Sequence, residues 1–279
     1  MTGRRSYFLI VTVGLGFAFL YLPIVSLVAY SFNASKLVTV WAGFSTKWYG
    51  VLMHDTALLK AAWLSLRIAT MNATLALILG TLAGFSLARF GRFRGRTLLS
   101  GMVTAPLVMP EVITGLSLLL LFVAMQGLIG WPEKRGITTI TIAHATFSLS
   151  YVAVIVQSRL TGLDESIEEA ALDLGARPAK VFFAITLPLI APALISGWLL
   201  SFTLSLDDLV LASFVSGPGA STLPMVIFSK VRLGVSPEIN ALATIMVGIV
   251  TIGIIISGIL MQRQEHRRRR DEQLARAGA

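Results

Sequence analysis

The sequence predicts an all-α polytopic membrane protein with six transmembrane helices, forming one membrane domain over residues 1–279. Of the 279 residues, 55% are hydrophobic and only 13% are charged. A soluble domain carries about a quarter charged residues. The apolar residues also gather in runs longer than the roughly 18 residues that make a candidate membrane span.

Six apolar segments can be read in chain order. The first, residues 7–32, is too long for a removed signal peptide and lacks a small-residue cleavage site, so we expect a retained helix. The third is interrupted by Pro106 and Pro110. A short re-entrant or surface-lying segment is expected between the fifth and the sixth. The later segments are expected at residues 63–87, 98–124, 137–156, 188–206 and 239–261.

The basic residues predict the orientation. With the N-terminus in the cytoplasm, 15 of the 23 Lys and Arg residues fall on the inner side and 8 on the outer side. Because positive residues favour the cytoplasmic flanks of spans, we expect both termini and the loop 157–187 in the cytoplasm. A basic tail, residues 262–279, is expected at anionic headgroups of the bilayer. This flanking pattern argues against nucleic acid as the reason for the net charge of +9.

Several kinds of site are excluded by composition. Cysteine is absent, and His54, His144 and His266 share no metal-ligand spacing, so we expect no metal site and place these histidines at interfaces or in loops. No phosphate-binding P-loop occurs, and the serines lack a paired His and acid. We therefore expect no catalytic residues and no cofactor, and the chain is not expected to be an enzyme.

Three groups of residues could meet a substrate. Glu111 lies about thirteen residues into the third segment, where an ionisable side chain normally faces a cavity or a partner. It is either a cation contact on the substrate path or a structural carboxylate that is paired with a neighbouring helix or simply protonated. Asp207 and Asp208 end the fifth segment. They either attract an ammonium group or are solvated, with Asp208 capping the next segment. Trp48 and Tyr49 offer cation–π faces or form part of an interfacial aromatic belt.

The most specific pattern is a polar stretch in the second half. Acidic residues crowd a short helical run that stops at Gly175 and restarts near Pro178. A helix–turn–helix at the membrane surface would give a partner protein something rigid to push on. The alternative is a purely structural role, as an amphipathic surface helix with a glycine cap. The residues of this stretch are Glu168, Glu169, Ala170, Ala171, Gly175, Ile185, Leu187 and Pro188.

The spacing E-A-A-x3-G-x9-I-x-L-P resembles the EAA loop of ABC-importer permeases at every fixed position. The resemblance implies the type I importer permease (MetI-like) fold, with Glu169 on the helix that couples to an ATPase. Further stretches resemble the polyamine branch of these permeases, at residues 31–36, 46–49, 201–208, 213–218 and 237–244.

That branch implies a bacterial inner-membrane assembly. Its expected members are a heterodimer with a second six-helix permease, two copies of a cytoplasmic ATPase that binds the ATP, and a periplasmic polyamine-binding protein. The implied cargo is putrescine, with spermidine or another cationic amine as the alternative. Trp48, Glu111, Asp207 and Asp208 become polyamine-path candidates, although the branch often has Asp in place of Glu111. A cation-coupled secondary transporter, with Glu111 as a proton relay, and a non-transporting scaffold remain as other classes.

Overall fold

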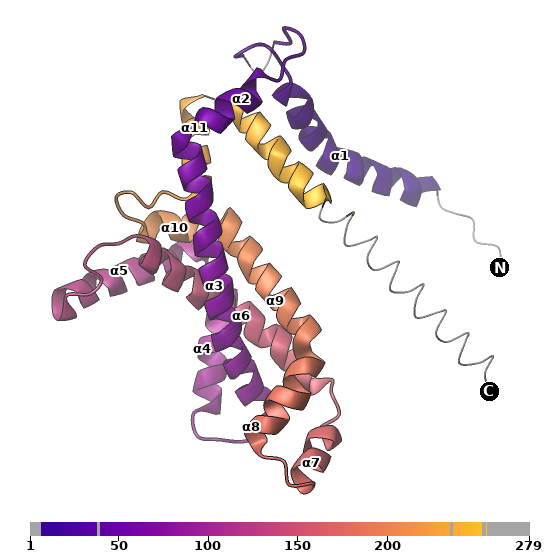
Figure 1. Ribbon diagram of the computed structural model, residues 1–279, viewed down its shortest axis with the longest axis vertical. Helices are drawn as coiled ribbons and strands as arrows, with labels where there is room; N and C mark the ends of the chain where they lie inside the picture. The colour runs from indigo at the N-terminus through magenta and orange to yellow at the C-terminus, as the bar shows by residue number, and fades with distance from the viewer. Residues whose placement is uncertain (1–6, 38–39, 235–236, 253–254, 256–279) are drawn as a thin grey trace. The chain divides into compact units, whose positions relative to one another are not determined.

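The computed structural model describes residues 7–37, 40–234, 237–252 and 255 (Figure 1). These residues are mostly helical, and the described part of the chain contains one isolated β-bridge, between Asn33 and Phe44, but no strand. The chain divides into two compact units. One is residues 57–229, and the other joins residues 1–56 with residues 230–279.

The larger unit is a bundle in which α3, α6 and α9 run side by side, with α7 beyond one end (Figure 1). The expected fifth helix extends further toward its N-terminus than residue 188, through α8 and a π-helical turn. The elements are α3 (Thr56–Arg89), α4 (Arg96–Val108), α5 (Glu111–Ile129), α6 (Ile137–Thr161), α7 (Ser166–Asp173), α8 (Pro178–Val181), the π-turn (Phe182–Thr186), α9 (Leu187–Asp207), α10 (Val210–Val215) and α11 (Leu223–Leu233), of which the last four residues belong to the smaller unit.

Small residues allow α3 to approach α6 closely. A Cβ atom placed on Gly80 would lie 2.6 Å from the Cβ of Val152, and one placed on Gly84 would lie 2.6 Å from the carbonyl oxygen of Ala153. Ala76, on the same helix, is completely buried. Glycine and alanine at such contacts are typical of membrane helices, where close van der Waals packing drives association.

A polar contact ties three helices together. The amide nitrogen of Asn72 on α3 donates to the carbonyl oxygen of Ser201 on α9 at 2.8 Å and to the hydroxyl of Ser148 on α6 at 3.3 Å. Asn72 and Ser201 are completely buried, and Ser148 is nearly so. Hydrogen bonds between membrane helices stabilise one arrangement of the bundle. The positions of α6 and α9 relative to α3 are therefore fixed, and so are the positions of the side chains on these helices.

Two predicted segments differ from the observed helices, and proline explains both. The expected third segment is two helices, because Met109 is extended with ψ of 136° before Pro110. The expected fifth helix was to begin near Pro188 but already begins at Pro178. The π-turn Phe182–Thr186 precedes Pro188, and such a widened turn accommodates a proline ring inside a continuing helix.

Five helices of the described residues are long and apolar enough to cross a membrane: Tyr7–Ser31, Thr56–Arg89, Glu111–Ile129, Ile137–Thr161 and Pro178–Asp207. The expected sixth is present as a shorter apolar helix, Pro237–Ile252. The remainder of that segment and the basic tail 262–279 lie outside the described residues. The short helices α10 and α11 occupy the region expected to be re-entrant or surface-lying.

The smaller unit contains α1 (Tyr7–Ser31) and α2 (Lys47–His54). Of the α1 residues only Ser31 is buried. A buried asparagine, Asn33, organises the loop that follows: its amide nitrogen donates to the carbonyl of Val40 at 2.7 Å, and its side-chain oxygen accepts the Ala42 amide at 2.9 Å. The unit also holds an ion-pair cluster in which Lys230 contacts Asp55 and Glu238.

Candidate functional site

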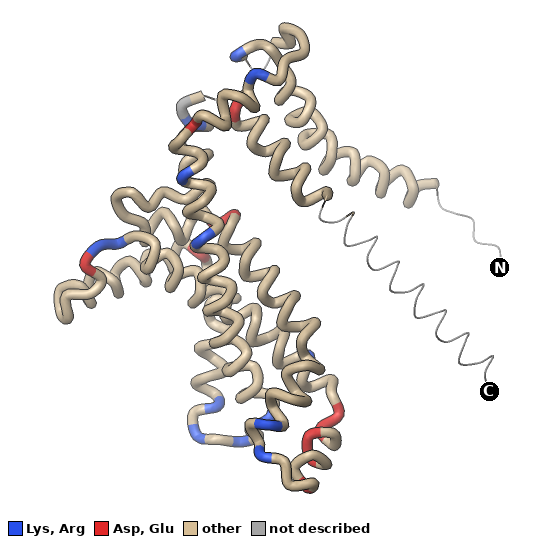
Figure 2. The backbone as a smooth tube through the Cα atoms, in the orientation of Figure 1, with Lys and Arg blue, Asp and Glu red and all other residues tan. Residues whose placement is uncertain are grey.

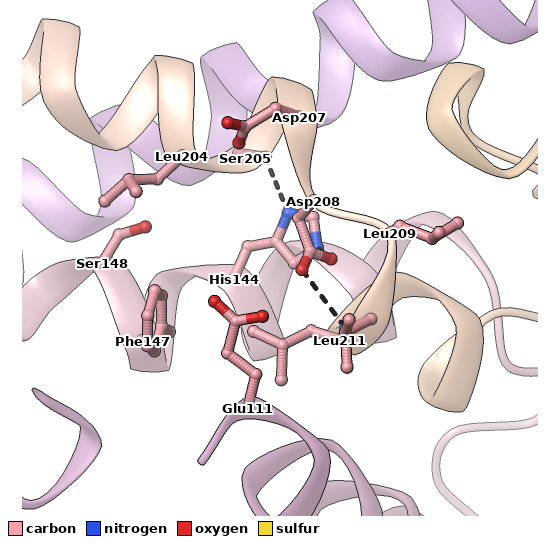
Figure 3. A pocket seen from close by; sticks show the side chains of 11 residues that line it. Glu111, His144, Phe147, Ser148, Leu204, Ser205, Asp207, Asp208, Leu209 and Leu211 are labelled. Carbon is pink, nitrogen blue, oxygen red and sulfur yellow. Dashed lines mark hydrogen bonds and ion pairs between the residues drawn. The ribbon is translucent and has the colours of Figure 1, made fainter. Parts of the chain in front are cut away.

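A pocket of about 280 Å³ lies in the larger unit and brings together three acidic residues that the sequence singled out separately. Glu111 comes from α5, Asp207 from the end of α9, and Asp208 from the turn into α10 (Figure 3). The helix α6 supplies one wall. The other lining residues are His144, Phe147, Ser148, Leu204, Ser205, Leu209, Val210 and Leu211.

Glu111 is the first residue of α5, not a mid-helix residue as the sequence suggested. The break at Pro110 starts a new helix there. Its side chain reaches into the pocket towards Phe147 and His144 (Figure 3), and the residue is exposed. Glu111 is thus an acidic residue in the first turn of α5, at the helix end that carries partial positive charge.

The adjacent carboxylates of Asp207 and Asp208 have different surroundings. Asp208 accepts the backbone amides of Leu211 at 3.2 Å and of Ala212 at 2.8 Å, and its side chain is 9% exposed. Asp208 thus caps the first turn of α10, although it is not solvated as that alternative expected, and its contact with a substrate stays a prediction. Asp207 is exposed and has no hydrogen bond or ion pair with the side chain of another described residue. One carboxylate belongs to the fold, and its neighbour is left open to the pocket.

His144 lies at the centre of this arrangement and is buried. Its Nδ1 is 2.7 Å from the hydroxyl of Ser205, and its Nε2 is 3.0 Å from Oδ2 of Asp208. The Nε2 contact is not aligned as a hydrogen bond. The expectation of an interface or loop position was wrong for His144, because it faces the core of the bundle. His54 is exposed at the end of α2, and His266 lies outside the described residues.

The arrangement suits an organic cation. Two exposed carboxylates, those of Glu111 and Asp207, border a space walled in part by Phe147 and leucines. Ammonium groups form charge-assisted hydrogen bonds with carboxylates, and aromatic faces attract cations. No cluster of three or more His, Asp or Glu residues that could hold a metal ion occurs in the described part of the chain.

Trp48 and Tyr49 do not line this pocket; they lie on α2 in the smaller unit. Trp48 is 5% exposed, and its indole N–H donates to the carbonyl of Asn33 at 2.6 Å. The Lys47 ammonium lies 4.7 Å from the Trp48 ring centroid. The Tyr49 hydroxyl is 2.8 Å from that of Ser31. These contacts stabilise the unit, and a place for either residue on a substrate path stays a prediction.

The polar stretch forms the expected helix–turn–helix, α7 followed by α8. The turn is a Schellman motif: the Ala176 amide donates to the Ala171 carbonyl at 3.0 Å and the Gly175 amide to the Leu172 carbonyl at 2.9 Å. Gly175 has φ of +83°, which a residue with a Cβ atom rarely adopts. Ala171, through its backbone carbonyl, and Gly175, through its positive φ, thus both take part in the turn.

The start of α7 is also fixed. The Asp164 carboxylate accepts the Ser166 amide at 3.0 Å, and this hydrogen bond holds the pKa of Asp164 below its ordinary value. A carboxylate that receives a backbone amide before a helix stabilises the exposed first turn. In Figure 2 the acidic residues of α7 and the basic residues after α3 gather at the same end of the larger unit.

Glu168 and Glu169 are adjacent but differently placed. Arg89, the last residue of α3, donates from Nε to Glu168 at 3.0 Å and from Nη1 to Glu165 at 2.9 Å. The other oxygen of Glu168 accepts the hydroxyl of buried Thr186 at 2.8 Å. Glu169 is exposed, and its side chain makes no hydrogen bond or ion pair with the described residues. Glu168 therefore ties α7 to α3 and to the π-turn. Of the remaining pattern residues, Ala170 and Pro188 are exposed, and Ile185 and Leu187 are half-buried.

Residues 76–270 match the family described as the inner-membrane component of binding-protein-dependent transport systems. The chain belongs to this family. The permease is 65% identical over 274 residues to the putrescine transport system permease protein PotI of Escherichia coli, with 98% of each chain covered. It is 44% identical over 244 residues to the spermidine/putrescine transport system permease protein PotC of Escherichia coli, covering 88% of this chain and 90% of that one.

Solved structures agree with this assignment at the level of the fold. The permease resembles a chain of a bacterial ABC transporter involved in import of the acidic polysaccharide alginate, with a TM-score of 0.70, 18% identity, and 94% and 98% of the two chains covered. It also resembles a chain of the inward-facing MetNI methionine ABC transporter, with a TM-score of 0.57, 18% identity, and 74% and 94% coverage. The predicted all-α, MetI-like importer permease fold is confirmed, and the permease is an inner-membrane component of a transport system.

Proposed function

We propose that this permease carries putrescine across the inner membrane as one subunit of an ATP-driven importer. The observation that supports this most is the pocket in which Glu111 and Asp207 present exposed carboxylates from two helices. The 65% identity to a putrescine permease over nearly the full length gives independent support. A diamine needs two separated anionic partners with an apolar surface between them.

The substrate is held by complementary charge and by the pocket walls. One ammonium group donates hydrogen bonds to Glu111 and the other to Asp207, while the methylene chain lies against Phe147 and neighbouring leucines. Charge-assisted hydrogen bonds supply the attraction, and the partial exposure of both carboxylates lets the ammonium groups leave again.

Transport requires other subunits. The permease pairs with a second six-helix permease, two copies of a cytoplasmic ATPase bind the ATP, and a periplasmic protein delivers the polyamine. Both termini and the α7–α8 loop face the cytoplasm, and α7 docks on the ATPase through Glu169. Closure of the ATPase dimer on ATP shifts α7, and the bundle alternates between outward and inward access. The permease itself needs no cofactor.

Spermidine is the second candidate cargo. It is favoured by the 44% identity to a spermidine/putrescine permease, and the pocket chemistry suits any amine with at least two ammonium groups. Competition between the two amines separates these candidates.

The test is uptake of radiolabelled putrescine by a strain that lacks this gene and any other polyamine importer, complemented by the wild-type gene. We expect uptake only in the complemented strain, with unlabelled putrescine competing better than spermidine. Stronger competition by spermidine would move the cargo to the alternative. Absence of polyamine uptake in the complemented strain would contradict the proposal.

A further inference from the structure

We propose that His144 and Asp208 form a positioning pair that aims the neighbouring carboxylate of Asp207 into the pocket, without touching the polyamine themselves. This inference rests on the proposed function for its substrate, but the pair is defined by the fold. It divides two adjacent aspartates, which the sequence treats alike, into a structural residue and a binding residue.

The first argument is that the backbone already holds the Asp208 carboxylate. Each of its two oxygens accepts a backbone amide, Leu211 at 3.2 Å and Ala212 at 2.8 Å, and one of them also lies 3.0 Å from His144 Nε2. Its side chain is 9% exposed. Because the Asp208 side chain is nearly buried and both of its oxygens are held by the backbone, it is less accessible to an ammonium group than the exposed Asp207.

The second argument is the place of His144 in the bundle. It sits on α6, whose partner α9 ends at Asp207, and its ring spans the two sides of the α9–α10 turn. Nδ1 contacts Ser205 in the last turn of α9, and Nε2 faces Asp208 immediately after that helix. In Figure 3 the ring lies next to both residues, and Asp207 is drawn on the far side of Ser205. Holding residues 205 and 208 leaves little freedom for residue 207.

The third argument is the cost of burying a histidine. Burial of a polar ring is unfavourable unless it is partnered, and Nε2 of His144 is buried without an aligned hydrogen bond. The acidic residues that line the same pocket are Asp207 and Asp208 from the α9–α10 turn and Glu111 from α5. The His144 ring therefore lies in a pocket lined by acidic residues. An apolar residue of similar size would fill the same space but could not orient the carboxylate of Asp208.

The isosteres of histidine allow the two contacts to be separated. An asparagine amide reaches about as far as Nδ1, and a glutamine amide about as far as Nε2. His144→Gln is thus expected to keep the contact with Asp208, His144→Asn to keep only that with Ser205, and His144→Ala to lose both. Thr203→Ala is the control, since Thr203 is exposed on the same helix as Ser205 and its hydroxyl donates to carbonyls of its own helix.

The experiment uses the complete importer in proteoliposomes with saturating loaded binding protein, and it measures putrescine imported per ATP hydrolysed. We expect His144→Ala and Asp207→Asn each to lower this ratio about tenfold, the size expected for one hydrogen bond to a charged group. His144→Gln should restore most of the ratio and His144→Asn little, and Thr203→Ala should leave it unchanged.

A double-mutant cycle gives the decisive comparison. If His144 acts through Asp207, the double variant His144→Ala/Asp207→Asn lowers the ratio no more than about twofold beyond Asp207→Asn alone. Multiplied effects of about a hundredfold would overturn the inference, because His144 would then act independently of Asp207. A loss of import and ATP hydrolysis together, with the ratio unchanged, would also overturn it, since that outcome reports only a damaged fold.

A second measurement does not depend on the cargo. Backbone amide hydrogen exchange of the peptide 209–215 follows the Leu211 and Ala212 amides that Asp208 accepts. Exchange should be faster in His144→Ala than in wild type and near wild type in His144→Gln. Unchanged exchange in His144→Ala would overturn the inference. Faster exchange in an importer that takes up no polyamine would instead contradict the proposed function alone.

Discussion

Two pairs of adjacent acidic residues, at opposite ends of the larger unit, follow the same rule. In the pocket Asp208 is fixed by two backbone amides and faces His144, while Asp207 is exposed. On α7, Glu168 is held by Arg89 and Thr186, while Glu169 is exposed. Each pair has one carboxylate that stabilises the fold and one that is available to a partner.

The difference between the pairs lies in what holds the fixed member. Asp208 is held mostly by backbone amides within one turn, so its effect is local. Glu168 is held by side chains from α3 and from the π-turn before α9, so its contacts join distant parts of the chain. The pocket pair is suited to orienting a ligand group, and the α7 pair to transmitting a movement into two long helices.

Reversing the exposed charge on α7 should have the largest effect. Glu169→Lys places a cation on the surface proposed to dock on the ATPase, where like-charge contacts or unpaired charges cost several kcal/mol. Putrescine uptake and the stimulation of ATP hydrolysis by loaded binding protein should fall about a hundredfold, a loss of roughly 3 kcal/mol in coupling. The amount of permease in the membrane should stay normal, because the Glu169 side chain makes no hydrogen bond or ion pair with the described residues.

The matched control is Glu133→Lys, in the loop between α5 and α6. Glu133 is also exposed and its side chain makes no hydrogen bond or ion pair within the described residues. It should leave uptake unchanged. Undiminished stimulation of ATP hydrolysis in Glu169→Lys would remove the docking assignment.

Removing the arginine clamp, the pair of ion pairs that Arg89 makes with Glu165 and Glu168, should have the next largest effect. Arg89→Ala leaves Glu168, whose side chain is 15% exposed, without its cation, and loss of one partner of a mostly buried ion pair costs about 3 kcal/mol. Thermal unfolding of the detergent-solubilised permease complex should shift to lower temperature. The double variant Arg89→Ala/Glu168→Gln should recover part of this loss, since it removes the unpaired charge.

Arg94→Ala is the control for the clamp, because Arg94 is exposed and has no hydrogen bond or ion pair with the described residues. It should unfold as wild type does. If the double variant is no more stable than Arg89→Ala alone, the charge pairing is not what stabilises α7.

The two pocket aspartates should separate function from stability. Asp208→Asn keeps one acceptor oxygen and loses a cap of α10, which should cost about 1 kcal/mol of stability. Asp207→Asn should lower putrescine import per ATP without any shift in thermal unfolding. Both quantities can be measured on the same purified complexes. Equal losses of stability in the two variants would contradict the division between a held and an open carboxylate.

The smallest effect concerns the ion-pair cluster of the smaller unit. Burial lowers the pKa of Lys230, but hydrogen bonds and charge attraction from Asp55 and Glu238 outweigh burial, so the pKa is raised above 10.5. The stabilisation is therefore complete below the ordinary lysine pKa and is lost as the pH rises through the raised value. Because the lysine is partly exposed, it should contribute less than about 1 kcal/mol.

Thermal unfolding of wild type and Lys230→Met at several pH values checks this. The difference in unfolding temperature should be constant from about pH 7 to pH 9.5 and shrink above about pH 10.5, near the ordinary pKa of lysine. A difference that grows with pH would show that the ammonium is not the stabilising species.

Local signals made the α7–α8 helix–turn–helix predictable from sequence. Gly175 predicts a helix stop because of its conformational freedom, and Pro178 predicts a helix start, and both are observed. The prediction that a helix begins near Pro188 was wrong, because a π-turn before this proline lets the helix continue through it. Pro110 was noted as an interruption, but not as the boundary that makes Glu111 a helix start.

The positioning contacts required the three-dimensional structure. Arg89 and Glu168 are 79 residues apart, and His144 and Ser205 are 61 apart, so no local pattern connects either pair. His144 did carry one usable signal, since it is an ionisable residue inside the apolar segment 137–156, and such residues normally have a partner. The sequence also gave no sign that Trp48 would be buried against the Asn33 loop.

The most direct test of the account is putrescine uptake by the double variant Glu111→Gln/Asp207→Asn, which removes both exposed carboxylates from the pocket while keeping the size of the side chains. Uptake should be normalised to the amount of permease in the membrane and compared with wild type in a strain without other polyamine importers. The account predicts loss of uptake from normally folded protein. Uptake at the wild-type rate would contradict it, because the cation would then cross without the two groups proposed to hold it.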